Sequence, residues 1–448
     1  MSSRPRALGP LVALFTVGYL APYLLPTVVG RLSAGLGLTP AQAGLVGSVL
    51  LLSSASAGFT LAARVERLGP RRAARIGLLA MIVGYGSAAL TTSVPQVVGG
   101  AVVGGFGSGT TLAVAASGIA AQRDPHRAST LGLLSVSATA GALYLSLPHL
   151  GGGHALAFAS IAMAAALVWP LTRGLAGGMG GLAGGAGRPA PGPGRGGGSP
   201  LPHRRSGLVL AGAILCWSMA QNALWGVSGR IGLTQAGLSE VTVGAVFAVA
   251  LGAGLAGVTA AGALGSRIGR AAPVGAGTAI IAGCVLVSSR AENLAAFATG
   301  EILWNILYPV VLSYLLGLAA SLDPRGRWAV LVGSASALGA ACGPVTGSVL
   351  SEQAGYPGMG LVLCVLLLLV AVPMTAVALH TSGRPLVPGS VRRRGGAPAA
   401  VLAGTTTAAT GPVPQMGAPE QEVTEIPVPA RRRADRRSFR LARPGDRG

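Results

Sequence analysis

The sequence has no lysine, few acidic residues and few aromatic ones. All 33 basic residues are arginine, against 12 Asp and Glu, and only 10% of the 448 residues are charged. This excludes an ordinary soluble domain, in which about 25% of residues carry charge. The four Cys occur singly, without CxxC or Cys/His spacing, and the five His lie in loops or at segment ends. Neither pattern predicts a disulfide framework, a metal site or a cofactor.

Long apolar runs are abundant instead. Half of the residues (51%) are hydrophobic, and many of them form runs of about 20, the length that crosses a bilayer core. Because lipid cannot satisfy backbone polar groups, such runs must be helical. We therefore expect an all-α polytopic membrane protein. Twelve transmembrane helices are predicted at 8–29, 40–62, 74–93, 95–120, 128–148, 153–172, 207–228, 240–263, 272–289, 293–319, 328–351 and 357–379.

The arginines orient the predicted helices. Three of the 33, Arg31, Arg230 and Arg290, fall in loops on one side, and the others lie in the alternate loops and both ends. The positive-inside rule makes the Arg-rich side cytoplasmic, so we expect a multi-pass protein of the plasma (inner) membrane with both termini in the cytoplasm. The net charge of +21 is then topogenic, and no aromatic-interleaved patch or module predicts a nucleic-acid partner.

The chain repeats itself at an offset of about 200 residues. The segment "GLTPAQAG" (37–44) matches "GLSEVTVG" (237–244), and "VVGR" (28–31) matches "VSGR" (227–230). The matches recur in order from loop to loop, which predicts two six-helix halves of the same orientation. Thr39 and Ser239, at matching positions, are predicted helix N-caps.

Composition divides the chain into four parts. A Gly/Pro/Arg-rich stretch at 173–206 is too polar and flexible to pack, and we expect it to be a cytoplasmic linker. It separates the halves 1–172 and 207–380. The segment 381–448 is rich in Ala, Thr, Pro and Arg, and is expected to be a disordered basic tail that either touches anionic lipid or is simply solvated.

The loop after the second helix of each half carries a basic signature. The first half has an Ala in place of the leading Gly, then Glu66, Arg67, Gly69, Arg71 and Arg72. The second half has Gly262, Arg267, Gly269 and Arg270, with a Ser in place of the acid. Glycine at the two central positions permits a sharp turn.

With this signature, the repeat and the twelve spans, the sequence resembles the major facilitator superfamily of secondary transporters, over roughly residues 8 to 380. The resemblance implies two six-helix bundles that rock about a central site, a small-molecule solute as partner and a monomer. It also implies that the loop pairs latch one conformation, although the arginines could equally serve topology alone.

Glu301 is the one acidic or basic residue embedded within a predicted span. It lies about eight residues into its helix, roughly 12 Å from one end and so close to mid-membrane. Trp304, Asn305 and Tyr308 follow it at the spacing of one helix face. An unpaired charge there costs roughly 3 kcal/mol. Glu301 is therefore predicted to accept and release a proton during the transport cycle or to anchor the solute. The alternative is that Glu301 is permanently protonated and joins helices by hydrogen bonding.

Further candidates for a central cavity come from the first helix of each half, as the family resemblance implies. Tyr19 and Tyr23 accompany Pro22 and Pro26, two prolines that should kink the helix and free backbone carbonyls. Trp217, Gln221 and Asn222 occupy the corresponding helix, and the two amides could instead bond between helices. Two other tryptophans near predicted helix ends, Trp225 and Trp328, are predicted to lie in an interfacial aromatic belt.

The functional expectation is solute transport, not catalysis. No nucleophile, metal or Walker A pattern is present to suggest an enzyme or ATP drive. Gly339, Gly343, Pro344 and Gly347 match a motif of antiporter members, although close helix packing explains it equally well. We expect a bacterial efflux-type antiporter coupled to H⁺ and exporting a drug-like compound or metabolite. An uptake symporter and a non-transporting sensor are the alternatives.

Overall fold

The computed structural model describes residues 8–122, 124–151, 153–175, 201–264, 269–323 and 326–382. The predicted tail and most of the predicted linker lie outside these residues, and so do the side chains of Glu66 and Arg67.

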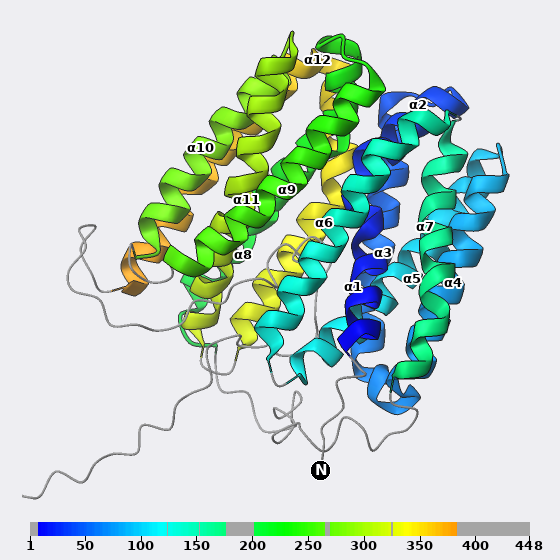
Figure 1. Cartoon of the computed structure of the whole chain (residues 1–448). Helices are drawn as coiled ribbons and strands as arrows, with labels where there is room; N and C mark the ends of the chain where they lie inside the picture. Colours follow the sequence, from blue (N-terminus) through cyan, green and yellow to red (C-terminus); the bar gives the residue numbers. More distant parts are fainter. Residues whose placement is uncertain are drawn as a thin grey trace, which may run out of the picture.

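The described part of the chain is a bundle of helices (Figure 1). The first half consists of α1 (Leu8–Tyr23), α2 (Leu25–Leu36), α3 (Pro40–Leu68), α4 (Pro70–Leu90), α5 (Val94–Ala120), α6 (Pro125–Leu150), α7 (His154–Val168) and a 3-10 turn, η2 (Trp169–Gly174). The second consists of α8 (Arg204–Arg230), a π-helical turn η3 (Ile231–Gln235), α9 (Glu240–Leu264), α10 (Ala271–Ser289), α11 (Leu294–Leu322) and α12 (Arg327–Ser382).

These elements amount to twelve spans. Ten helices are long and apolar enough to cross a bilayer, and the α1–α2 pair, bent by 47°, forms an eleventh span. The twelfth comes from α12, in which the chain reverses at Gly355 (φ 68°, ψ 172°), so that two helices follow one another. The predicted all-α fold with twelve membrane helices is confirmed. The first span differs from the prediction because it is broken at Leu24 and continues to Leu36.

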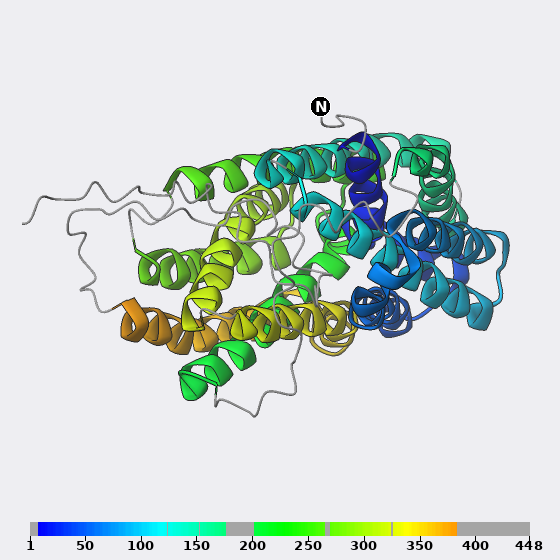
Figure 2. The ribbon, with the colours of Figure 1, turned by 90° about the horizontal axis from the view of Figure 1, so that it is seen from below.

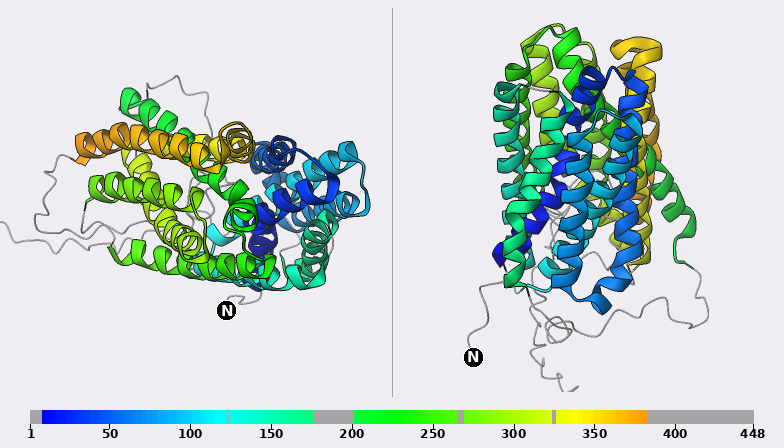
Figure 3. Two further views of the ribbon diagram at one scale, coloured as in Figure 1. Left: turned by 90° about the horizontal axis from the view of Figure 1, so that it is seen from above. Right: turned by 90° about the vertical axis from the view of Figure 1, so that its right-hand side faces the viewer.

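The two halves stand side by side, as the views along the bundle show (Figures 2 and 3). Six spans per half return the chain to the side from which it started. We call the side at which α1 begins and α12 ends the terminal face. The opposite side, where α2 and α6 end and α9 begins, is called the Arg31 face after the residue that lies there.

The bilayer explains what the helices expose. Large apolar side chains stand on the outside of the bundle, among them Leu90 (91% exposed), Leu167 (71%) and Val372 (69%). In water such a surface would aggregate, whereas in lipid it is solvated. At the exposed starts of α3 and α9, Thr39 Oγ1 accepts from the amide of Gln42 and Ser239 Oγ from that of Thr242, which confirms both predicted N-caps.

Glycines set the closest helix crossings. A side chain at Gly105 or Gly109 of α5 would meet backbone carbonyls of α3, and one at Gly339 or Gly347 of α12 would meet carbonyls of α8. Because interior lipid offers no hydrophobic drive between helices, such close approach is a main source of association. The packing interpretation of the glycine motif in α12 is therefore confirmed.

Candidate functional site

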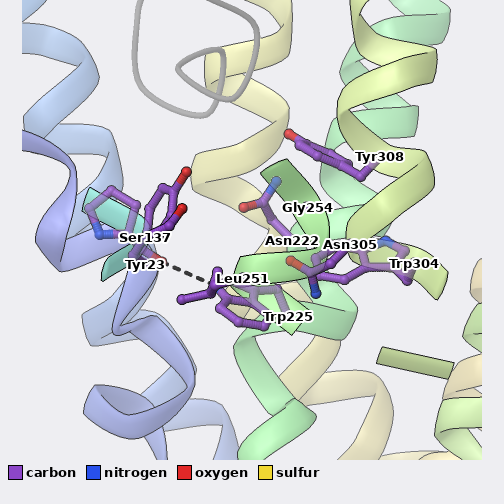
Figure 4. Close-up of a pocket in the computed structure, with 10 residues that line it drawn as sticks. Tyr23, Ser137, Asn222, Trp225, Leu251, Gly254, Trp304, Asn305 and Tyr308 are labelled. Atoms are coloured by element: carbon purple, nitrogen blue, oxygen red, sulfur yellow. Dashed lines mark hydrogen bonds between the residues drawn. The ribbon is translucent and has the colours of Figure 1, made fainter. Parts of the chain in front are cut away.

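A cavity lies where the two halves meet near the middle of the bundle (Figure 4). About 570 Å³ of space lies between its walls, part of it open to solvent. Its walls come from α1 and α6 of the first half and from α8, α9 and α11 of the second. The lining residues are Pro22, Tyr23, Ser137, Asn222, Trp225, Leu251, Gly254, Trp304, Asn305 and Tyr308.

Five of the residues predicted for a central cavity are among these ten: Tyr23, Asn222, Trp304, Asn305 and Tyr308. The others lie behind them. Tyr19 is buried against the rings of Phe15 and Tyr23. Trp217 stacks on Tyr308 with ring centroids 5.2 Å apart. These residues support the lining side chains from behind.

Gln221 is also a supporting residue. Its side-chain oxygen accepts a short hydrogen bond from the indole nitrogen of Trp304, and the residue is fully buried. The bond joins α8 to α11 and fixes the orientation of the Trp304 ring. The interhelical alternative that the sequence left open for this amide is the arrangement seen.

Trp225 corrects the prediction of an interfacial belt. It is 7% exposed, lines the cavity and stacks with Trp304 at 5.6 Å between centroids. The prediction was wrong because α8 and η3 continue to Gln235, which puts Trp225 well inside the bundle. Trp328 is not in a belt either, since it is fully buried and its indole donates to the carbonyl of Pro202 over 2.7 Å.

The break between α1 and α2 positions one wall of the cavity. In a regular helix the carbonyl of Pro22 would accept from the amide of residue 26, but Pro26 has no N–H. That carbonyl instead accepts from Trp225 Nε1 of the other half over 3.0 Å. The next carbonyl, of Tyr23, accepts from the hydroxyl of Tyr144 over 2.7 Å. The prediction that these prolines kink the helix and free carbonyls is thus confirmed.

Glu301 lies on α11, one turn from the cavity, and is fully buried. Its Oε1 accepts hydrogen bonds from Ser228 of α8 over 2.8 Å and from Ser288 of α10 over 3.1 Å. Its Oε2 has no hydrogen-bond partner among the described residues, and no described residue forms an ion pair with it. A buried carboxyl half satisfied in this way is costly to keep ionised.

Glu301 is the eighth residue of α11, and its mid-membrane depth stays a prediction. Its partner Ser288 is the penultimate residue of α10, which ends at the Arg31 face. Tyr308 and Asn305, which line the cavity, lie further along α11 toward the terminal face. The carboxyl therefore occupies a position between the cavity and the Arg31 face.

The internal repeat shows that the polar cluster exists in one half. Glu301 corresponds to Ala101, and Ser228 corresponds to Val29 in the "VVGR" and "VSGR" match. Gly100 packs on Ala88 as Gly300 packs on Ser288, so Ala88 is the third counterpart. All three counterparts are buried and apolar. The carboxylate and its two hydroxyl partners thus replace an apolar contact as a set, which identifies the second half as the carrier of the ionisable chemistry.

The predicted loop signatures are partly described. Gly69 and Gly269 have φ of 80° and 69°, so both take the left-handed turn that glycine permits. Arg71 and Arg72 lie in the first turn of α4, Gly262 lies in α9, and Arg270 directly precedes α10. Arg267 and the side chains of Glu66 and Arg67 lie outside the described residues. The latch remains a prediction.

Contacts between the halves lie toward the Arg31 face. Arg31 NH2 forms an ion pair with Glu240 Oε2 at 3.3 Å, and Arg31 also donates to the carbonyls of Leu147 and Gly151. Glu352 Oε2 accepts from the amide of Ala41 over 3.0 Å, at the start of α3. Deeper in, Ser48 accepts from the amide of Val345. The Arg31 face is therefore closed in this conformation.

Replacing Glu240 by Gln should shift the bundle toward a conformation open at the Arg31 face. The exposed carboxylate makes the pair worth about 0.2–1 kcal/mol, which corresponds to a change of roughly 1.4- to fivefold in population. Spin labels at Ala34 and Val241 in a cysteine-free background would report the distance across this face. In Glu240→Gln we expect a larger fraction of long distances than in the parent protein. In the control Glu292→Gln we expect no change in this fraction. An unchanged distribution would show that the pair does not hold the face closed.

With fold and site in place, comparisons with known proteins define the class. The family model of the Major Facilitator Superfamily matches residues 7–324, and the chain belongs to this family. Its fold is similar to that of the human organic anion transporter MFSD10 (TETRAN), with a TM-score of 0.57, 19% identity and coverage of 83% of this chain and 100% of that one.

A second similar structure is that of a bacterial homologue of the human lysosomal transporter Spinster, in an inward-facing and unoccupied conformation. The TM-score is 0.57 at 16% identity, and the match covers 85% of this chain and 96% of that one. At these identities the two structures support the fold alone. A search of the curated proteins found no match.

Proposed function

We propose that this chain is a secondary active transporter that exports a small drug-like compound or metabolite in exchange for protons. The observation that carries the proposal is Glu301, a fully buried carboxyl with a free Oε2, set one turn from a cavity between the halves. Membership of the family supports solute transport, whereas the ion and the direction rest on this site.

Protonation is the chemistry that suits Glu301. The two serine hydroxyls can stabilise an ionised Oε1, and the protonated carboxyl can hold its hydrogen on Oε2 without breaking either bond. Both states are thus accommodated with little rearrangement. An intramembrane carboxyl that tolerates both states can load a proton in one conformation and release it in the other.

Alternating access is supported by the position of the inter-half contacts. The distribution of arginines makes the Arg31 face extracellular and the terminal face cytoplasmic, in the plasma (inner) membrane. A bundle closed at the Arg31 face is then an inward-facing or occluded state. Rocking of the halves would separate Arg31 from Glu240 and expose the cavity to the other side.

The direct test is flux in proteoliposomes with an imposed pH gradient. Three compounds of different charge serve as probes: ethidium, chloramphenicol and fluorescein. We expect uphill movement of at least one, against the proton gradient, with opposite proton movement recorded by entrapped pyranine. Movement of solute in the same direction as protons would favour an uptake symporter. Binding of a probe with no flux of any probe or of protons would favour a sensor and overturn the proposal.

A further inference from the structure

Each asparagine that lines the cavity directs one of its two amide N–H groups into the protein. Asn222 Nδ2 donates to the carbonyl of Ser218 over 2.9 Å, and Asn305 Nδ2 donates to the carbonyl of Glu301 over 3.0 Å. A backbone carbonyl can only accept, so these bonds fix which end of each amide is nitrogen. The amide oxygens are left for the cavity. Figure 4 shows both oxygens on the side that faces Tyr23 and Ser137.

The two lining indoles follow the same pattern. Trp225 Nε1 donates to the carbonyl of Pro22, and Trp304 Nε1 donates to the side-chain oxygen of Gln221. What these residues offer a ligand is therefore the ring face, not the N–H. The remaining polar groups of the lining, the hydroxyls of Tyr23, Ser137 and Tyr308, can accept as well as donate.

The residues that line the cavity carry no charge. None of the ten lining residues in the described part of the chain is Arg, His, Asp or Glu. The charge nearest to them along α11 is the buried carboxyl of Glu301, one turn before Trp304 and Asn305. The aromatic rings of Trp225, Trp304 and Tyr308 pack in sequence at 5.6 and 5.7 Å between centroids. Ring faces attract cations, by about 2 kcal/mol or more where water is excluded.

We propose that the cavity binds an organic cation that combines an aromatic ring with a protonated amine. The amide oxygens of Asn222 and Asn305 accept from the ammonium N–H groups, and the rings of Trp225, Trp304 and Tyr308 contact its aromatic part and its charge. This inference rests on the transport role proposed above and names the class of solute. An anion of the same size would lose its hydration and would meet no positively charged side chain among the lining residues in return.

A matched series of ligands tests the proposal on the purified full chain. The probes are 2-(2-naphthyl)ethylammonium, its N-trimethyl analogue and 3-(2-naphthyl)propionate, which share one ring system and differ in N–H groups and charge. Affinities come from calorimetric titration at neutral pH without any gradient. We expect the primary amine to bind at least about tenfold more tightly than the propionate, with the trimethyl analogue between them. Equal or tighter binding of the propionate, or no binding of the amine, would overturn the proposal.

Substitutions then locate the acceptors. Asn305→Leu should reduce affinity for the primary amine and diminish its advantage over the trimethyl analogue, because one of the two amide oxygens is lost. Gln122→Leu is the matched control, since Gln122, two residues after the end of α5, also donates its side-chain amide to the carbonyl four residues earlier and is not among the cavity-lining residues. Asn305→Asp keeps the shape and adds charge, and should widen the amine-to-propionate ratio. An unchanged ratio in Asn305→Asp contradicts the assignment even if Asn305→Leu fails to fold.

The outcome is separable from that of the proposed function. A preference for the amine at equilibrium, together with absence of pH-driven flux, would remove the transport proposal and keep the ligand class. Proton-coupled movement of fluorescein, with tighter binding of the propionate, would keep the transport proposal and remove the proposed ligand class.

Discussion

Glu301→Gln should abolish solute accumulation driven by a pH gradient, with a loss of about 100-fold or more in rate, the scale associated with removing an acid–base group. The amide keeps the size of the carboxyl and can still accept from Ser228 and Ser288 through its oxygen, so the bundle should fold. It cannot load or release a proton. The measurement is uphill uptake of the transported probe into inside-acidic proteoliposomes, followed alongside pyranine fluorescence.

Two controls separate coupling from folding. Glu292→Gln makes the same chemical change at an exposed position just before α11 and should transport as the parent does. Solute exchange at equal pH on both sides should persist in Glu301→Gln, because exchange needs the cavity and the rocking motion but no net proton transfer. Full pH-driven accumulation in Glu301→Gln would remove this residue from the coupling role.

Gly347→Ala should strongly destabilise the second half. Its Cβ would meet the carbonyl oxygen of Ala223, which is backbone and cannot move aside, so α8 and α12 must separate. Overpacking of this kind costs about 1–3 kcal/mol. Adding Gly339→Ala, which meets the carbonyl of Leu215, should increase the loss. Thermal unfolding in detergent, followed by a thiol-reactive dye, would record the fall in melting temperature.

The chain provides its own controls for this change. Gly212 of α8 and Gly283 of α10 are helical and exposed, and a methyl on either would meet nothing within 4 Å. Alanine there should be neutral or should stabilise the helix by up to about 1 kcal/mol. If Gly347→Ala melts at the same temperature as Gly212→Ala, the close crossing of α8 and α12 does not limit stability.

The spans could be predicted because each depends on local composition. Runs of apolar residues and the repeat located eleven spans nearly to the helix ends, and helical spacing alone placed Trp304, Asn305 and Tyr308 on one face. The first span was the exception. Pro26 frees a carbonyl, and the break in the helix depends on which group donates a hydrogen bond to that carbonyl.

The rest of the site depends on which helices meet. Ser137 carries no signal in a helix with many small polar residues, and it lines the cavity only because α6 packs beside α1. The serine partners of Glu301 come from two further helices, so spacing along α11 could not reveal them. The repeat could have suggested Ser228, because this serine aligns with an apolar residue, Val29, in the matching segment of the first half.

The freed carbonyl of Pro22 has a consequence for how the two halves recognise each other. The bond from Trp225 is received by a main-chain oxygen, which every residue at position 22 would provide. The residue that makes this oxygen available is Pro26, four positions away, which takes no part in the bond. The contact between Trp225 and the carbonyl of residue 22 therefore depends on a third residue that takes no part in it. Substitutions at 22 should spare it, whereas any residue with an N–H at 26 would compete with the tryptophan for the same oxygen.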